Sequence, residues 1–268
     1  MIIDFHTHTF PENIAAAALK KLAETSGTTP HSDGTETALK KSMEKYGITY
    51  SVMLPVATKP QQVPVINDHA IEVNAQALSE GCGLLSFGAM HCAYEGYREE
   101  LKCLKEAGVK GIKLHHDYMK LYFDDERSLR VIEEAFLNGL IVMLHAGDDP
   151  VSRDIHYCTP ERISGSLNRL KGGVLIASHF GGLMNVEEAK EFLAGKDLYI
   201  DTSMGHHYFG LETLREMLLL HNPDKILFGT DSPWENQGTG LALLRSMSLS
   251  EEMIKKITGE NPQRLLGL

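Results

Sequence analysis

Histidines and one aspartate follow short apolar segments at several separate points of this sequence. The chain begins MIIDFHTH, which places His6 and His8 two residues apart directly after an apolar run. His145 is the last residue but one of the segment LIVMLHA, His179 closes VLIASH, and Asp231 closes KILFGTD. Imidazole nitrogens and a carboxylate oxygen are ligands that suit Zn²⁺ and similar divalent ions. The pattern predicts a metal site, provided that the fold brings these residues together.

The elements that must position these residues recur along the whole chain. Between apolar segments lie stretches of helical pattern, such as residues 94–108, 125–139 and 186–195, which end at glycines as helices commonly do. Parallel strands need a crossover of helical length, so the alternation predicts a parallel sheet. Eight such units in 268 residues favour one closed (β/α)8 (TIM) barrel domain over an open doubly wound α/β sheet. The predicted strands are residues 2–8, 48–56, 83–91, 109–115, 140–146, 174–179, 198–203 and 225–231.

Such a barrel would gather the histidines at one rim. In (β/α)8 barrels, catalytic groups lie at the carboxyl ends of the strands. His91 and His115 also fall at such ends, and the two-residue period of a strand turns His6 and His8 to the same face. Scattered histidines would not give this arrangement. We therefore expect a funnel of imidazoles and one carboxylate at the mouth of the barrel.

Each of these residues, taken alone, has a structural alternative. A His-x-His pair on one strand is weak evidence for a metal, and His145 or His179 could be a polar residue before a glycine turn. Asp231 precedes Ser232 and Pro233, and Ser232 could cap a helix that opens with Pro233. The metal hypothesis therefore depends on the combination, because several such coincidences together are improbable.

The composition narrows the classes of function. Hydrophobic residues make up 43% of the chain and charged residues 23%, which is ordinary for a protein with a full core. The net charge of −10 and the lack of a basic stripe argue against a nucleic-acid or anionic-membrane partner. The first residues show no signal-peptide pattern, the apolar runs are too short to span a bilayer, and the four cysteines are scattered. We expect a cytoplasmic protein that acts on a small-molecule substrate, and homo-oligomer formation stays open.

The sequence resembles the second amidohydrolase family of the amidohydrolase superfamily, which includes aminocarboxymuconate-semialdehyde decarboxylase. The resemblance covers essentially the whole chain, in the segments DFHTHTFPENI, LPVATKP, GIKLHHDY, LHAGDD, CTPERI, SHFGG, FGTDSPW and ITGENPQRLLGL. It implies a single divalent metal, usually Zn²⁺, held by His6, His8, His145 and Asp231. It also implies that His179 stands beside the metal and the substrate.

The chemistry of such a centre agrees with these roles. A divalent ion activates water and polarises a carbonyl, which are the two tasks that hydrolysis requires. Asp231, as a weak ligand with a free oxygen, could take the proton of water and pass it to the leaving group. His179 could orient the nucleophile or donate to a developing oxyanion. We therefore expect Asp231 and His179 to be catalytic.

The fourth predicted strand carries Lys113 and His115 on one face, so both should point into the barrel. Some superfamily members carboxylate a lysine on this strand to bridge two metals. This sequence resembles the mononuclear branch, in which that lysine usually stays unmodified. We expect both residues to contact the substrate, with Lys113 as the cation for a carboxylate. His116 stands where relatives tend to have proline, and we expect it to face solvent rather than to reshape the pocket.

Three further residues are expected to contact the substrate from loops. Arg153 and His156 fall in the long loop after the fifth strand, and Trp234 follows the eighth. A solvated loop face is the alternative for the first two, and plain packing is the alternative for Trp234. His206 and His207 follow the seventh strand and should line the rim.

These observations predict a metal-dependent hydrolase of a small amide, ester or lactone. The alternative is a carbon–carbon lyase, a non-oxidative decarboxylase of an unsaturated or aromatic carboxylic acid, because relatives with this ligand set do that chemistry. A metal-binding barrel without catalysis is a weaker hypothesis, since it gives no reason for Asp231 and His179 beside the ligands. A metal-free phosphate-binding barrel is weaker still, because no glycine-rich phosphate loop follows the seventh and eighth strands.

Overall fold

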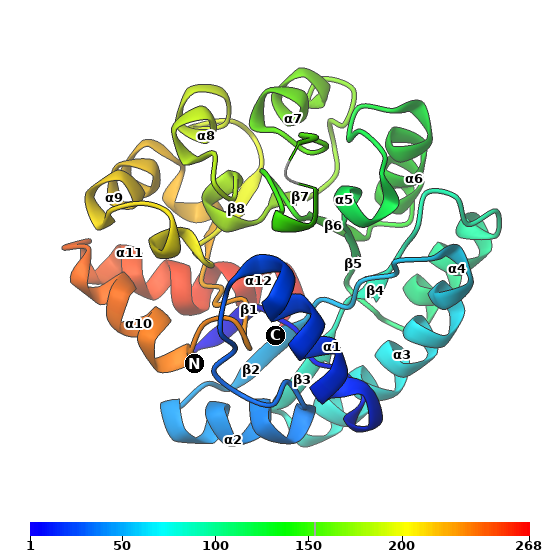
Figure 1. Ribbon diagram of the computed structural model, residues 1–268, viewed down its shortest axis with the longest axis horizontal. Helices are drawn as coiled ribbons and strands as arrows, with labels where there is room; N and C mark the ends of the chain where they lie inside the picture. Colours follow the sequence, from blue (N-terminus) through cyan, green and yellow to red (C-terminus); the bar gives the residue numbers. More distant parts are fainter. Residues whose placement is uncertain (153) are drawn as a thin grey trace.

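A ring of parallel strands surrounded by helices forms the core of the protein (Figure 1). It is seen in a computed structural model that describes residues 1–152 and 154–268. Neighbouring strands pair in chain order and every pair is parallel. The strands are β1 (Ile3–Thr7), β2 (Tyr50–Met53), β3 (Gly83–Ser86), β4 (Gly88–Ala89), β5 (Gly111–Leu114), β6 (Ile141–Leu144), β7 (Leu175–Ala177), β8 (Tyr199–Asp201) and β9 (Ile226–Leu227).

The two sheets, β1–β3 and β4–β9, close into one barrel. Only Phe87 separates β3 from β4, and its N–H still donates to a carbonyl of β2 at 3.0 Å. At the other junction, Phe5 N–H donates to Phe228 O at 2.8 Å and joins β1 to the end of β9. In the described part of the chain, eight strand positions therefore complete the ring, and every predicted strand falls on one of them. The fold is the predicted (β/α)8 barrel.

Helices cover the outside of this ring (Figure 1). The segments predicted as helices correspond to α4, α6 and α8, and the buried residues of α6 follow a helical period at Leu129, Ile132 and Ala135. The helices are α1 (Glu12–Ser26), α2 (Glu36–Tyr46), α3 (Val63–Glu80), α4 (Tyr97–Glu106), α5 (His116–Met119), α6 (Glu126–Leu137), α7 (Pro160–Ser166), α8 (Val186–Phe192), α9 (Leu211–Leu220), α10 (Gln237–Ser246), α11 (Glu251–Lys255) and α12 (Asn261–Leu266).

None of the helices in residues 1–152 and 154–268 has the length and apolarity needed to cross a membrane.

A buried carboxylate holds the first strand against the last one. Asp4 accepts hydrogen bonds from Thr230 N at 3.0 Å, from Thr230 Oγ1 at 2.6 Å and from Gln237 Nε2 at 2.8 Å. Burial raises the pKa of Asp4 to about 6, although these hydrogen bonds act in the opposite direction. The contacts fix the backbone one residue before Asp231, so the closure of the ring and the position of Asp231 depend on the same group.

Gly147, three residues after the end of β6, provides a test of this scaffold. Its φ is +90°, and a Cβ at this position would overlap the backbone N and O of Leu183. Leu183 N–H donates to Ala146 O at 2.7 Å, so its segment cannot move aside without losing hydrogen bonds. We expect Gly147→Ala to lower the free energy of unfolding by about 2–4 kcal/mol in urea denaturation. The control is Gly165→Ala in α7, where a Cβ meets no described atom within 4 Å. Equal stability of the two variants would contradict this account.

Candidate active site

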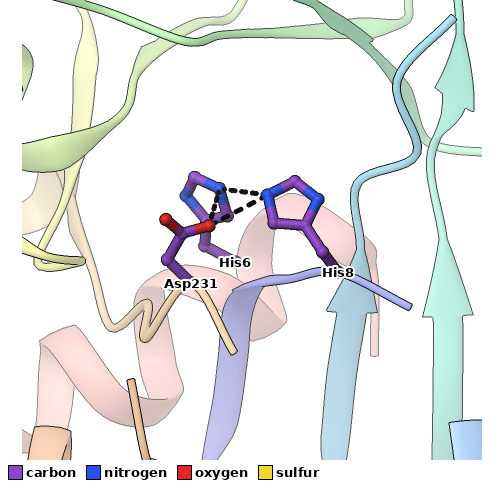
Figure 2. Close-up of side chains that lie close together, drawn as sticks. All are labelled: His6, His8 and Asp231. Atoms are coloured by element: carbon purple, nitrogen blue, oxygen red, sulfur yellow. Dashed lines mark hydrogen bonds and ion pairs between the residues drawn. The ribbon is translucent and has the colours of Figure 1, made fainter. Parts of the chain in front are cut away.

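His6, His8 and Asp231 converge where β1 and β9 end (Figure 2). His6 Nε2 lies 3.1 Å from His8 Nε2. Asp231 Oδ1 lies 3.2 Å from His6 Nε2 and 2.9 Å from His8 Nε2. Ligand atoms held by one tetrahedral ion at ~2.0–2.1 Å are roughly 3.3 Å apart, so the observed spacing fits a shared cation. This group and its neighbours suggest a divalent metal.

The orientation of His6 is fixed from behind by Asp201, at the end of β8. Asp201 Oδ2 lies 2.7 Å from His6 Nδ1. Since an ionised carboxylate only accepts, Nδ1 carries the ring proton and Nε2 turns its lone pair toward His8 and Asp231. A lone pair facing a carboxylate oxygen is unfavourable unless a cation lies between them. A carboxylate behind a histidine ligand is also the usual arrangement in metal centres.

Local charges support a cation at this point. Burial acts to raise the pKa of Asp231, but His6 and His8 hold that pKa well below its usual range. Burial and the Lys113 ammonium act to lower the pKa of His6, but Asp201 and Asp231 outweigh them, and the pKa is raised. Two buried carboxylates therefore stabilise positive charge beside His6, which either a proton or a metal ion supplies.

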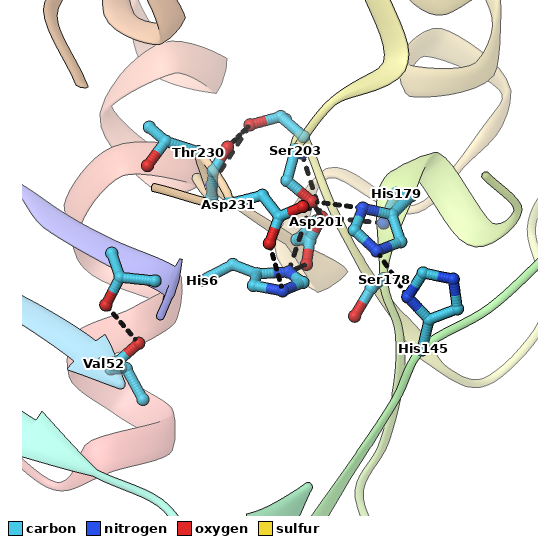
Figure 3. Close-up of polar contacts among 12 residues, drawn as sticks. His6, Val52, His145, Ser178, His179, Asp201, Ser203, Thr230 and Asp231 are labelled. Atoms are coloured by element: carbon cyan, nitrogen blue, oxygen red, sulfur yellow. Dashed lines mark hydrogen bonds and ion pairs between the residues drawn. The ribbon is translucent and has the colours of Figure 1, made fainter. Parts of the chain in front are cut away.

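A chain of hydrogen bonds extends from Asp201 to the predicted fourth ligand (Figure 3). The Ser203 hydroxyl donates to Asp201 Oδ1 at 2.6 Å and lies 2.8 Å from His179 Nδ1. His179 Nε2 lies 3.1 Å from His145 Nδ1. We take each group along this chain to donate toward Asp201. His145 then carries its proton on Nδ1, which faces His179, and its lone pair on Nε2. Burial lowers the pKa of His179 to about 3, so this ring is neutral.

His145 itself lies apart from the other three predicted ligands. Its ring stacks on His115 with 4.2 Å between centroids and 9° between planes. The Nε2 atoms of His145 and His115 lie 3.5 Å and 3.4 Å from Asp149 Oδ2. Among the described residues, His145 Nε2 has no hydrogen-bond partner. Three predicted ligands therefore meet directly, and the fourth is linked to His6 through His179, Ser203 and Asp201.

Two residues at the site have an uncommon backbone conformation. Asp231 has φ 62° and His179 has φ 60°, in the left-handed region that non-glycine residues rarely adopt. Such strain persists where the surrounding structure imposes it, typically at functional sites. The helix-cap explanation for Asp231 is wrong, because the next helix begins only at Gln237. Its cap is Asn236, whose side chain accepts from two backbone N–H groups.

The predicted substrate contacts on β5 are buried. Lys113 is 1% exposed, and its Nζ donates to Ser178 Oγ at 3.2 Å. Burial lowers the pKa of Lys113 to about 8, although Asp201 and Asp231 act in the opposite direction. His115 is 7% exposed. A contact between either residue and a substrate stays a prediction.

The predicted loop contacts have different surroundings. His156 is exposed and its Nδ1 pairs with Asp148 Oδ1 at 2.6 Å. It lines a groove of about 880 Å³ with residues of α7 and α8. Trp234 is half-buried, and its backbone N–H donates to the backbone carbonyl of Asp231 at 2.9 Å. Arg153 lies outside the residues that the structure describes. Substrate contacts of these three residues stay predictions.

Asp201 and Ser203 were not among the predicted site residues. Both lie in the predicted strand LYIDTS, and a carboxylate at the end of a barrel strand was a usable signal. Asp149, which faces His115 and His145, was also missed. It lies in the loop after β6, and the sequence alone does not define the conformation of that loop.

His116 does not face solvent as expected. It is fully buried in the one-turn helix α5, where its Nε2 lies 2.8 Å from Ser128 Oγ and its ring packs on Phe123. The prediction failed because α5 turns this side chain toward α6. Burial lowers the pKa of His116 to about 3, with a smaller contribution from His115.

A family model matches almost the entire chain, over residues 3–268, and its description is Amidohydrolase. The chain belongs to the second amidohydrolase family. This membership confirms the resemblance seen in the sequence. No curated protein matches the sequence.

Solved structures share the fold over its full length. The 5-carboxyvanillate decarboxylase from Sphingomonas paucimobilis matches with a TM-score of 0.69 and 14% identity, covering 100% of this chain and 99% of that one. A probable 2-pyrone-4,6-dicarboxylic acid hydrolase from Acinetobacter baumannii, with citric acid bound, gives 0.70 and 16%, with 100% and 99% covered. A dihydroxybenzoic acid decarboxylase from a Polaromonas species, with manganese and the inhibitor 2-nitroresorcinol bound, gives 0.69 and 19%, with 100% and 97% covered. At these identities the likeness shows the fold.

The role of Asp201 is testable by Asp201→Asn. Both carboxylate oxygens accept from donors, so an amide NH₂ in either position faces a donor. We expect the affinity of chelator-treated protein for Mn²⁺ or Zn²⁺ to fall 10–100-fold in an indicator competition. Asp197→Asn, at an exposed residue paired with Lys225, is the matched control and should bind as the wild type does. An unchanged affinity in Asp201→Asn would show that the orientation of His6 does not depend on this carboxylate.

The buried His116 predicts a pH dependence of stability. Its folded pKa of about 3 lies below the usual 6.5, so the unfolded chain takes up the proton first as the pH falls. The stability that the buried neutral ring contributes is fully present above about pH 6.5. It is lost progressively as the pH falls from 6.5 toward 3. Between pH 7.5 and 5.5, the wild type should lose about 1.4 kcal/mol more unfolding free energy than His116→Asn in urea titrations. His69→Asn, at an exposed histidine, should follow the wild type. Parallel curves for wild type and His116→Asn would refute the prediction.

Proposed function

We propose that the protein is a metal-dependent lyase that releases CO2 from an aromatic or unsaturated carboxylic acid without an oxidant. The observation that carries the proposal is the burial of the site, where His6, His179 and Asp201 are 1%, 1% and 0% exposed. The side chains of His8 and Asp231 are only 18% and 11% exposed, and such restricted access of water favours loss of CO2 over attack by water. Two of the three similar structures described above are decarboxylases of aromatic acids, and this supports the same choice.

In this proposal, one divalent ion is held by His6, His8 and Asp231, with His145 as the fourth ligand. The Nε2 of His145 has no hydrogen-bond partner within residues 1–152 and 154–268, and this supports its inclusion. When bound, the ion supplies Lewis acidity to oxygens of the substrate. Zinc is the ion proposed from the resemblance, and the nitrogen and oxygen donor set also suits manganese, which the Polaromonas enzyme binds.

Asp231 is the proposed proton carrier. Loss of CO2 leaves the electron pair of the broken bond on the substrate carbon, and this carbon must then take up a proton. Asp231 contacts both His6 and His8 through Oδ1, so its other oxygen is the proposed point of proton exchange. His179 contacts Ser203 and His145 through its two ring nitrogens, and we assign it to position these groups beside the substrate.

Hydrolysis of a small amide, ester or lactone is the second candidate. The fold similarity to the probable 2-pyrone-4,6-dicarboxylic acid hydrolase favours it. The same residues would serve, with Asp231 accepting the proton of water and passing it to the leaving group. The two candidates therefore differ in the group that receives the proton from Asp231, which is the substrate carbon in the first and the leaving group in the second, and in their products.

The remaining expectations belong to this proposal. We propose one catalytic barrel over residues 1–268, located in the cytoplasm, with a small-molecule substrate and no nucleic-acid or membrane partner. The proposed substrate contacts are Lys113, His115, Arg153, His156 and Trp234.

The proposal predicts CO2 release in a screen of hydroxylated benzoates and unsaturated acids with Mn²⁺ or Zn²⁺. Lactones and esters are assayed in parallel for a new carboxylate. Asp231→Asn should lower kcat by ~10²–10⁴ while it retains much of the metal, because the imidazole ligands remain. Asp224→Asn, at an exposed aspartate, should keep the wild-type rate.

Two results would decide against this assignment. Turnover of lactones or esters without CO2 release would replace the proposal by the second candidate. A wild-type rate in Asp231→Asn, with full metal content, would leave both candidates without their proton carrier.

A further inference from the structure

A second group of metal-type ligands lies on the loops after β8 and β9. His206 and His207 belong to the 3₁₀ turn Gly205–His207, and Glu235 follows β9 on a separate loop. Glu235 Oε2 lies 2.6 Å from His206 Nε2 and 3.3 Å from His207 Nε2. The imidazole centroids are 4.1 Å apart. Two nitrogens and one carboxylate oxygen thus approach one point from two segments that are distant in the sequence.

The carboxylate of this group is buried without adequate hydrogen bonding. Glu235 is 3% exposed, and its Oε1 accepts from Asn236 N at 3.0 Å. Oε2 has no hydrogen-bond partner within residues 1–152 and 154–268, so its short contact with His206 lacks hydrogen-bond geometry. A buried carboxylate oxygen in this state is costly. A cation shared with the two Nε2 atoms would neutralise it.

A proton on His206 alone would neutralise Glu235 but would leave His207 Nε2, 3.3 Å from the same oxygen, without a shared cation, and protonation of both histidines is costly. Two imidazolium rings with centroids 4.1 Å apart would repel each other, whereas two neutral imidazoles share one cation without that cost. The surroundings also leave room and access. His206 and Glu235, but not His207, line an adjoining cavity of about 20 Å³, enough for one water-sized group. The side chains of His206 and His207 are 25% and 30% exposed, so an ion can enter from solvent.

We propose that His206, His207 and Glu235 form a second divalent-metal site of the two-imidazole, one-carboxylate type that zinc accepts, with a remaining position open to solvent. It shares no residue with the His6, His8 and Asp231 group, so it does not depend on the proposed function. The ion joins the loop that follows Ser203 to the loop that follows Asp231, and thereby restrains the two segments that carry the active site.

The test is the number of zinc ions bound per chain. Full-length protein is treated with a chelator and dialysed against Zn²⁺, and its metal content is measured by elemental analysis. We expect two ions in the wild type and one in Glu235→Gln. The matched control Glu36→Gln removes a partly exposed glutamate that pairs with His69 at 2.7 Å, and it should keep two ions. His6→Ala/His8→Ala should keep one ion, and the triple variant with Glu235→Gln should keep none.

A second measurement guards against misfolding of Glu235→Gln. His207→Asn, at an exposed position, should also bind one ion. Added Zn²⁺ should raise the Tm of His6→Ala/His8→Ala but leave the Tm of the triple variant unchanged. A zinc count that neither Glu235→Gln nor His207→Asn lowers would overturn the proposal. If these variants lose one ion while His6→Ala/His8→Ala loses none, the second site stands and the metal centre of the proposed function fails.

Discussion

The buried carboxylate of Asp201 is the acceptor on which the order of the active site depends. One oxygen takes the Nδ1–H of His6, and the other takes the Ser203 hydroxyl and the backbone N–H of His179. The contact with His6 turns the lone pair of its Nε2 toward His8 and toward Asp231 Oδ1. The contacts of the other oxygen set the ring of His179. A carboxylate in this environment is stable only when its oxygens are hydrogen-bonded, so acceptor and donors hold each other in place.

Closure of the barrel brings this network to the proposed metal ligands. His6 and Asp231 are 225 residues apart, and they meet because β1 lies beside β9. The hydrogen bond between Asp4 and the Thr230 hydroxyl stabilises that junction inside the barrel. The left-handed backbone conformation of Asp231 directs its carboxylate toward His6 and His8. Residues that no local segment could assemble are thus held by strand order and a few buried hydrogen bonds.

The barrel and the meeting of His6, His8 and Asp231 could be predicted, because apolar segments with helical connections define the strands and strand ends meet at one rim. The finer arrangement could not. His116 was misplaced because a one-turn helix turns it inward, and the contact of His206 with Glu235 depends on two loop conformations. Propensity and periodicity specify where strands run, but they carry little information about how irregular loops fold back.

The central claim is that the lone pairs of His6 and His8 and the carboxylate of Asp231 face one divalent cation. Anomalous diffraction measures this directly, on crystals grown with Zn²⁺ and with data collected on both sides of the zinc absorption edge. The account predicts a peak within roughly 2.0–2.2 Å of His6 Nε2, His8 Nε2 and Asp231 Oδ1. The contrary result is an empty map at this point, with the three atoms joined directly by protons.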